Sequence, residues 1–98
     1  MRAIEWTNAF KRDYKRVKAN PRHGDIENLL PEITGLLAED RLLPEKQRDH
    51  VLGGNWKNHR ECHLKPDLLL IYKRPDEDTL RLVRIGSHSE LFAKLSYA

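Results

Sequence analysis

The spacing of apolar residues changes at Gly53-Gly54, and this change restricts the class of fold that the chain can adopt. Before it, apolar residues recur at intervals of three and four: Ile26, Leu29, Leu30, Ile33, Leu36 and Leu37. That spacing predicts an amphipathic helix. After it, apolar residues alternate with polar ones or form short runs, which predicts strands. Helices followed by strands indicate an α+β domain.

Weaker signals complete the predicted order of elements. Residues 2–6 alternate weakly and predict a first strand, and Thr7-Asn8 can cap a helix that runs through residue 19. The apolar stripe of this helix is Phe10, Tyr14 and Val17. In the second helix Asp25 is the expected N-cap. Because proline removes a backbone hydrogen bond, we expect a kink or a late start at Pro31.

Three strands are predicted over residues 55–64, 68–73 and 79–85, and Ser89 can cap a final helix that holds Leu91, Phe92 and Leu95. Residues 68–73 are apolar on both faces, which is typical of a central strand. The order β-α-α-β-β-β-α predicts a small antiparallel sheet, with two N-terminal helices packed on one face and a short C-terminal helix.

Strand parity assigns the residues between 55 and 64 to two faces. Trp56, Cys62 and Leu64 fall on one face, and Arg60 shares their parity. The other face carries Lys57, His59, Glu61 and His63. We therefore expect one apolar and one polar face in this strand.

Length and composition exclude several classes of protein. The 98 residues allow one domain, residues 1–98. The longest apolar run is far shorter than the roughly 20 residues of a membrane helix, and no signal-peptide core follows Met1, so we expect a cytoplasmic protein. One cysteine, Cys62, excludes an internal disulfide. The net charge of +3 permits a polyanionic partner without indicating one.

Residues able to transfer protons gather where the predicted strands begin and end. His63 ends one strand, Asp67 begins the next and His88 follows the last. Adjacent antiparallel strands bring such positions to one edge of a sheet, and His50 can reach that edge from the preceding connector. We therefore expect His50, His63, Asp67 and His88 to converge.

Such a cluster suits cleavage of RNA by its own 2′-hydroxyl. Histidine titrates near pH 6.5, so one imidazole can take the 2′ proton while another protonates the departing 5′-oxygen. A cation must stabilise the dianionic phosphorane, for which Arg84 and Lys57 are the candidates. Asp67 can orient an imidazole or act as the base itself. This scheme requires no metal ion.

Other interpretations of these residues stay open. Any one histidine can be a structural or surface residue, and we assign His23 and His59 to that class. Three histidines with Asp67 could form a zinc site, although the spacing from His63 to Asp67 crosses a turn and matches no tight ligand pair. Cys62 is expected to be a small buried residue and not a nucleophile.

Two runs resemble the YafQ-type branch of the RelE/ParE toxin superfamily. The first, residues 48–72, reads R-D-H-x-L-x-G-x-W-K-x-x-R-E-x-H-x-x-P-D-x-x-L-I-Y. The second, residues 84–92, reads R-x-G-S-H-x-x-L-F. With the leucine-rich helix and the Leu43-Pro44 connector, the resemblance covers nearly the whole chain.

The resemblance implies a RelE-like toxin domain of a type II toxin–antitoxin system. Toxins of this branch cut the messenger RNA codon in the ribosomal A site, beside the 16S rRNA, and need neither metal nor cofactor. A cognate antitoxin neutralises them. The family's functional positions fall on His50, His63, Asp67, His88 and Phe92, with Arg84 as a phosphate-binding residue. Phe92 would stack on a base.

One position departs from the resemblance. Close relatives carry tryptophan after Asp67, whereas this chain has Leu68. Loss of that aromatic side chain is expected to weaken base or ribosome contact, or to alter codon choice. Two other functions stay open: a gyrase inhibitor of the ParE type, which would not need the histidines, and an inactive binding module on the same fold.

Overall fold

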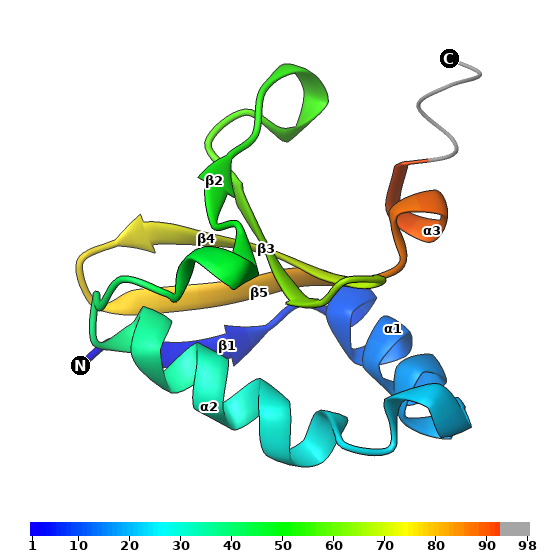
Figure 1. Cartoon of the computed structure of the whole chain (residues 1–98). Coiled ribbons are helices and arrows are strands. Elements are labelled where there is room, and N and C mark those ends of the chain that lie inside the picture. Colours follow the sequence, from blue (N-terminus) through cyan, green and yellow to red (C-terminus); the bar gives the residue numbers. More distant parts are fainter. Residues whose placement is uncertain (93–98) are drawn as a thin grey trace.

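A computed structural model describes residues 1–92, which form a five-stranded sheet with two helices on one face and a short third helix on the other (Figure 1). The strands are β1 (Ala3–Trp6), β2 (His50–Val51), β3 (Arg60–Lys65), β4 (Leu68–Asp76) and β5 (Thr79–Gly86). The helices are α1 (Asn8–Ala19), α2 (Ile26–Ala38) and α3 (His88–Phe92), with 3₁₀ turns η1 (Pro21–His23), η2 (Glu45–Gln47) and η3 (Gly54–Trp56). The predicted α+β fold is confirmed. None of the described helices is long and apolar enough to cross a membrane.

The strand order β1-β5-β4-β3-β2 corrects two expectations. Strand β1 runs parallel to β5, with Ile4 opposite Leu80, so the sheet is mixed and not purely antiparallel. Side chains alternate between the two faces of a strand whether it pairs in parallel or antiparallel, so the sequence of a four-residue edge strand does not reveal the direction of its pairing. Strand β2 adds to the predicted order and pairs with β3, with His50 opposite Glu61. Strand β2 could not be predicted, because two residues are too few to show the alternation of apolar and polar side chains that is typical of a strand.

Strand β4 is the centre of the sheet and is buried on both faces, as predicted. Leu68, Leu70 and Tyr72 belong to the core beneath α1 and α2, whereas Leu69 and Ile71 pack with α3. Leu68 is only 1% exposed. The leucine at this position therefore serves core packing in the free chain.

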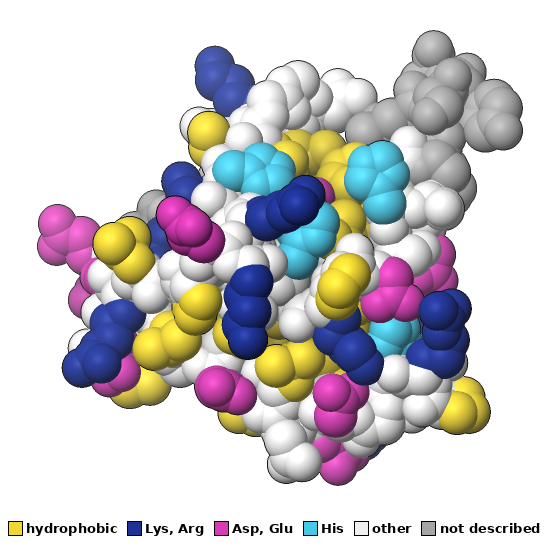
Figure 2. Space-filling model, in the orientation of Figure 1, with side chains coloured by type: hydrophobic (Ala, Val, Ile, Leu, Met, Phe, Trp, Pro, Cys, Tyr) yellow, Lys and Arg dark blue, Asp and Glu magenta, His cyan; other side chains and the backbone are white. Residues whose placement is uncertain are grey.

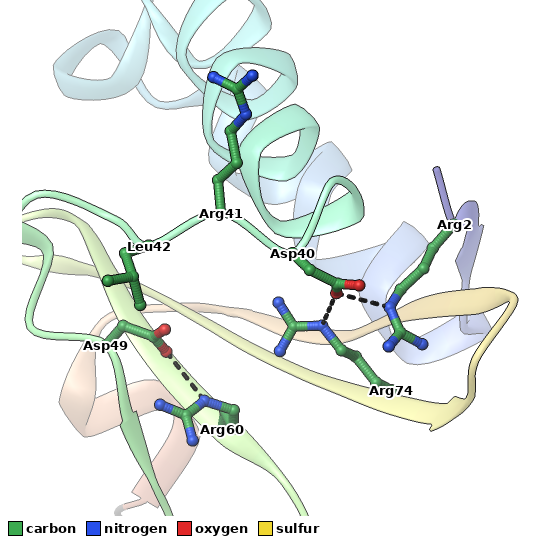
Figure 3. A pocket seen from close by; sticks show the side chains of 7 residues that line it. All are labelled: Arg2, Asp40, Arg41, Leu42, Asp49, Arg60 and Arg74. Carbon is green, nitrogen blue, oxygen red and sulfur yellow. Dashed lines mark hydrogen bonds and ion pairs between the residues drawn. The ribbon is translucent and has the colours of Figure 1, made fainter.

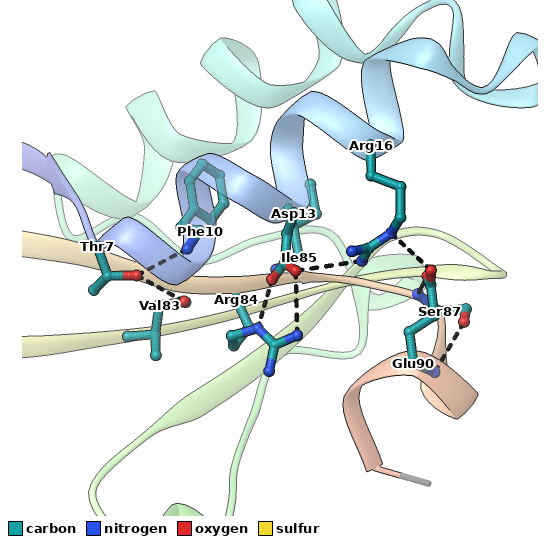
Figure 4. A network of polar contacts seen from close by, with 9 residues as sticks. All are labelled: Thr7, Phe10, Asp13, Arg16, Val83, Arg84, Ile85, Ser87 and Glu90. Atoms are coloured by element: carbon teal, nitrogen blue, oxygen red, sulfur yellow. Dashed lines mark hydrogen bonds and ion pairs between the residues drawn. The ribbon is translucent and has the colours of Figure 1, made fainter. Parts of the chain in front are cut away.

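Helix α1 has the predicted amphipathic form and the predicted cap. The Thr7 hydroxyl accepts the Phe10 N–H at 3.0 Å and donates to the Val83 carbonyl at 2.8 Å, which ties the start of the helix to β5 (Figure 4). Phe10 and Val17 are buried against the sheet, and Tyr14 is partly buried beside them.

Helix α2 runs without interruption through Pro31, so the expected late start is wrong. Pro31 and Glu27, whose carbonyl would have accepted the missing hydrogen bond, are both exposed, and water can satisfy that carbonyl. Asp25 is the N-cap as predicted, and its carbonyl accepts the Asn28 and Leu29 N–H groups, but its side chain makes no capping hydrogen bond. Its carboxylate instead accepts from the Lys65 ammonium at 3.0 Å, which ties the start of α2 to β3.

The strand predicted over residues 55–64 begins only at Arg60. Residues 54–56 form η3 instead, and Asn58 adopts a left-handed conformation with φ of 70° that breaks the extended chain. Cys62 and Leu64 lie in the core as predicted. Trp56 does not join them, because the turn places it on the opposite face of the sheet with Leu69, Ile71 and Phe92.

The cap of α3 lies two residues earlier than predicted. Ser87, not Ser89, bonds reciprocally with Glu90: the Ser87 N–H donates to Glu90 Oε1 at 2.8 Å, and the Glu90 N–H donates to Ser87 Oγ at 3.2 Å. This capping box fixes the start of the helix beside the end of β5. Leu95 lies outside the described residues.

Stability is expected to fall in mild alkali. Burial raises the pKa of the Cys62 thiol and of the Tyr72 hydroxyl well above their ordinary values. The unfolded chain therefore releases both protons at a pH where the folded chain keeps them. Between pH 7.5 and 10 the free energy of unfolding should drop by roughly 2 kcal/mol from these two groups. Urea unfolding followed by circular dichroism measures the change. A Cys62→Ala/Tyr72→Phe variant that loses as much over this interval would contradict the assignment.

Candidate functional site

The face of the sheet opposite α1 and α2 is only partly covered, and it carries most of the predicted site residues. We call it the histidine face and define it by His50, Glu61, His63, His88 and Phe92. Figure 2 shows histidine side chains (cyan) gathered around dark blue atoms of lysine or arginine in the upper half of the view, with apolar side chains (yellow) between them. Imidazoles and cations therefore share one accessible surface.

Two of the predicted histidines converge on one carboxylate. His50 Nε2 lies 3.5 Å and His63 Nε2 lies 3.7 Å from the same oxygen, Glu61 Oε1. The Glu61 side chain is 7% exposed, so its charge faces the imidazoles more than bulk water. Pairing of β2 with β3 brings His50 opposite Glu61, and strand alternation puts His63 on the same face as Glu61.

A backbone contact fixes the orientation of His50. Its Nδ1 lies 2.6 Å from the carbonyl oxygen of Arg48. Because a carbonyl can only accept a hydrogen bond, Nδ1 carries the proton and Nε2 is directed at Glu61. Nε2 is therefore the nitrogen of His50 that is available for proton transfer.

Aromatic side chains occupy the other half of the histidine face. The rings of His88 and Phe92 lie 4.9 Å apart, and Phe92 lies 6.3 Å from Trp56, which in turn contacts His59 at 5.3 Å. Leu91 anchors α3 in the apolar layer with Leu69 and Ile71. The ring of Phe92 is thus held by packing, and the residue stays partly exposed.

His63 and His88 are separated by the width of β4. His63 is opposite Leu69, and Leu69 is opposite Gly86, two residues before His88. Two strand spacings put the backbones of His63 and Gly86 about 10 Å apart, so His63 and His88 border opposite sides of a strip of surface. An extended substrate can lie between them.

Arg84 is held by a buried carboxylate from α1. Its Nε and Nη2 donate to the two oxygens of Asp13, and the Ile85 N–H donates to the same side chain at 3.2 Å (Figure 4). The hydrogen bond with Asp13 raises the pKa of Arg84. Arg16 bridges Asp13 at 3.3 Å and Glu90 at 2.9 Å, so one network joins α1, β5 and α3. Two of the donors of Arg84 are therefore committed within the protein.

Within residues 1–92, neither Asp67 nor Lys57 forms a hydrogen bond or an ion pair with His50 or His63. Asp67 lies in the turn between β3 and β4, where its carboxylate is 3.5 Å from the Arg22 guanidinium. Lys57 is exposed just after η3, and its carbonyl lies 3.0 Å from His59 Nδ1. Among the described residues, Glu61 takes the place beside the histidines that we expected for Asp67. The sequence contained one indication of this role for Glu61: strand alternation places its side chain on the same face as that of His63.

A hollow of about 350 Å³ on another part of the surface is lined by arginines (Figure 3). Arg2 and Arg74 share Asp40, at 2.8 and 3.1 Å, and Arg60 lies 3.3 Å from Asp49. These pairs join the connector before β2 to strands β3 and β4. The hollow thus has a structural explanation that needs no ligand.

A metal site does not form from the predicted ligands. Within residues 1–92, no group of three or more histidine, cysteine, aspartate or glutamate side chains is placed to hold a metal ion. His50 and His63 share the Glu61 carboxylate at distances of 3.5 and 3.7 Å, which suits hydrogen-bonded or ion-paired groups.

Comparison with known proteins shows close relatives. The family described as the bacterial toxin of a type II toxin-antitoxin system, YafQ, matches residues 2–93. The mRNA interferase toxin YafQ of Escherichia coli (strain K12) is 40% identical over 91 residues, which are 93% of this chain and 96% of that protein.

Solved structures give the same match. YafQ from E. coli strain BL21(DE3) has a TM-score of 0.80 at 39% identity, covering 94% of this chain and 99% of its own. A metal-bound toxin from Helicobacter pylori has a TM-score of 0.83 at 48% identity, covering 94% of this chain and all of its own. YafQ in the E. coli DinJ-YafQ complex has a TM-score of 0.79 at 39% identity, covering 94% of this chain and 99% of its own.

Proposed function

Because the chain belongs to the YafQ family of type II toxins, we propose that it is a messenger RNA endonuclease that acts in the ribosomal A site without a metal ion. The observation that carries this proposal is the pair of histidines, His50 and His63, that face one buried carboxylate on an open surface. His88 and Phe92 border the same surface across β4. A toxin that acted by surface contact alone would not need these groups.

In the proposed reaction the 2′-oxygen attacks the adjacent phosphorus, and the bond to the 5′-oxygen breaks. The products are a 2′,3′-cyclic phosphate and a free 5′-hydroxyl. A neutral imidazole beside Glu61 takes the 2′ proton, and His88 gives a proton to the 5′-oxygen. Glu61 stabilises the imidazolium formed by the first transfer, and Asp67 assists the same side from the neighbouring turn. Arg84 and Lys57 contribute positive charge toward the phosphorane.

The same membership supports a protein partner. YafQ of E. coli forms a complex with DinJ. We infer that a cognate antitoxin binds this chain and blocks its activity, and that the ribosome and messenger RNA are its targets in the absence of the antitoxin.

Removal of the Glu61 carboxylate, which His50 and His63 share, tests whether the two histidines take part in cleavage. A Glu61→Gln variant keeps the shape of the side chain and should slow single-turnover cleavage by about tenfold or more, since the imidazolium loses its counter-charge. A Glu77→Gln variant in the exposed β4–β5 turn is the matched control and should cleave at the wild-type rate. Equal rates for the two variants would remove Glu61 from the mechanism.

Expression in growing bacteria separates the proposed function from the alternatives. We expect incorporation of labelled amino acids to stop soon after induction while DNA synthesis continues. Signs of DNA damage with continued protein synthesis would indicate a gyrase inhibitor. Normal growth would indicate an inactive binding module.

A further inference from the structure

Two hollows meet beside His63, between η2, the end of β3 and the turn that follows. One measures about 330 Å³ and reaches to α2, and the other measures about 320 Å³. Both are lined by Lys46, His63 and Pro66, so together they form one groove. We call it the η2 groove. It adjoins the histidine face at His63.

The η2 groove carries positive charge that the protein does not neutralise. Lys46 and Arg48 line it and are exposed, and neither side chain has an ion-pair partner among residues 1–92. Lys65 also lines the groove, but its ammonium is bound to Asp25 at 3.0 Å and to the Arg22 carbonyl at 2.8 Å. The Asp25 carboxylate, which also lines the groove, is therefore already paired with Lys65 and does not neutralise Lys46 or Arg48. The arginine hollow differs, because each of its arginines is ion-paired, with Asp40, Asp49 or Glu39.

Arg48 connects the η2 groove with the second histidine of the pair. Its backbone is left-handed, with φ of 47°, and its carbonyl lies 2.6 Å from His50 Nδ1. Arg48 also lines the hollow that His63 lines. One residue therefore contacts His50 through its backbone and lines the same hollow as His63.

We propose that the η2 groove binds the phosphodiester backbone of the RNA strand beside the cleaved bond, with Lys46 and Arg48 as its phosphate contacts. Single-stranded RNA is held by positively charged grooves that follow its backbone. Leu29 lines the part of the groove nearer α2 and is partly exposed, and Pro66 lines both hollows and is exposed, so the two offer an apolar surface to a sugar or base. This inference rests on the proposed function, since it assigns the path by which substrate reaches His63.

The test uses the whole chain and a fluorescent single-stranded oligonucleotide with 2′-O-methyl groups, which cannot be cut by 2′-hydroxyl attack. The groove variant is Lys46→Gln/Arg48→Asn, because asparagine tolerates the left-handed backbone at position 48. The control variant, Lys11→Gln/Arg12→Gln, removes the same charge from exposed positions on α1. Thermal melting establishes that all variants are folded.

We expect the groove variant to bind the oligonucleotide about tenfold or more weakly than wild type. The slope of log affinity against log salt should fall in magnitude by about 1.4, as for two lost phosphate contacts. The control variant should keep most of the affinity, and an Arg48→Lys variant should keep more than Arg48→Asn. Equal binding by wild type, groove variant and control would overturn the proposal.

A ribosome-dependent cleavage assay on an unmodified message, run with the same variants beside the binding measurement, separates this proposal from the endonuclease itself. Lost binding in the groove variant together with no cleavage by wild type would support the groove and reject the proposed function. Ribosome-dependent cleavage by wild type with unchanged half-saturating concentration in the groove variant would support the function and reject the groove.

Discussion

A His88→Ala variant is expected to cleave messenger RNA at least about 10²-fold more slowly than wild type in a single turnover. His88 is exposed at the start of α3, and its ring lies 4.9 Å from Phe92 across β4 from the histidine pair. In the proposed reaction it protonates the 5′-oxygen, and loss of a general acid costs about 10²–10⁴ in rate. The rate is measured on programmed ribosomes under saturating toxin.

Ser89→Ala is the matched control for this prediction. Ser89 is the next exposed residue of α3 and does not cap the helix, since Ser87 has that role. Both variants should melt near the wild-type temperature, because neither side chain lies in the core. An unchanged cleavage rate for His88→Ala would remove His88 from the mechanism.

An Asp13→Ala variant is expected to lose roughly 3 kcal/mol of folding free energy, the largest stability effect that we predict for a single substitution. The Asp13 carboxylate is 5% exposed and accepts from Arg84 and from the Ile85 N–H. Its removal leaves the guanidinium of Arg84 half-buried without a counter-charge, and one backbone donor without a partner. Urea unfolding measures the loss.

A double variant isolates the cause of that loss. Asp13→Ala/Arg84→Met removes both charges, so it should be more stable than Asp13→Ala alone. Further destabilisation by the second substitution, or a loss below about 1 kcal/mol in the single variant, would contradict the view that this pair joins α1 to β5.

The sequence allowed the helices to be predicted because their signal is local. The stripe from Ile26 to Leu37 repeats every three or four residues, and Thr7 is followed at once by a helical pattern. Asp13 gave no such signal, because its partner Arg84 is 71 residues away and only the tertiary fold brings them together. Trp56 was misplaced because Asn58 turns the chain between it and β3.

The histidine face could be predicted only in part for the same reason. Alternation along one strand placed Glu61 with His63, and the register of β2 then brought His50 opposite Glu61. Turn geometry is less predictable: Asp67 follows His63 closely in sequence, yet its ion-pair partner is Arg22. His63 and His88 lie on either side of β4 because β3, β4 and β5 pair in chain order. The short turns between these strands made that pairing predictable.

Primer extension on a defined message tests the central claim most directly. The purified chain is added to a translation reaction in three forms: with ribosomes, without ribosomes, and with ribosomes plus a chelator selective for transition metals, which leaves in place the Mg²⁺ that ribosomes require. The account predicts in-frame cuts that require ribosomes and persist in the chelator. Continued protein synthesis on an intact message would contradict it, and cuts that vanish in the chelator would contradict the metal-independent mechanism.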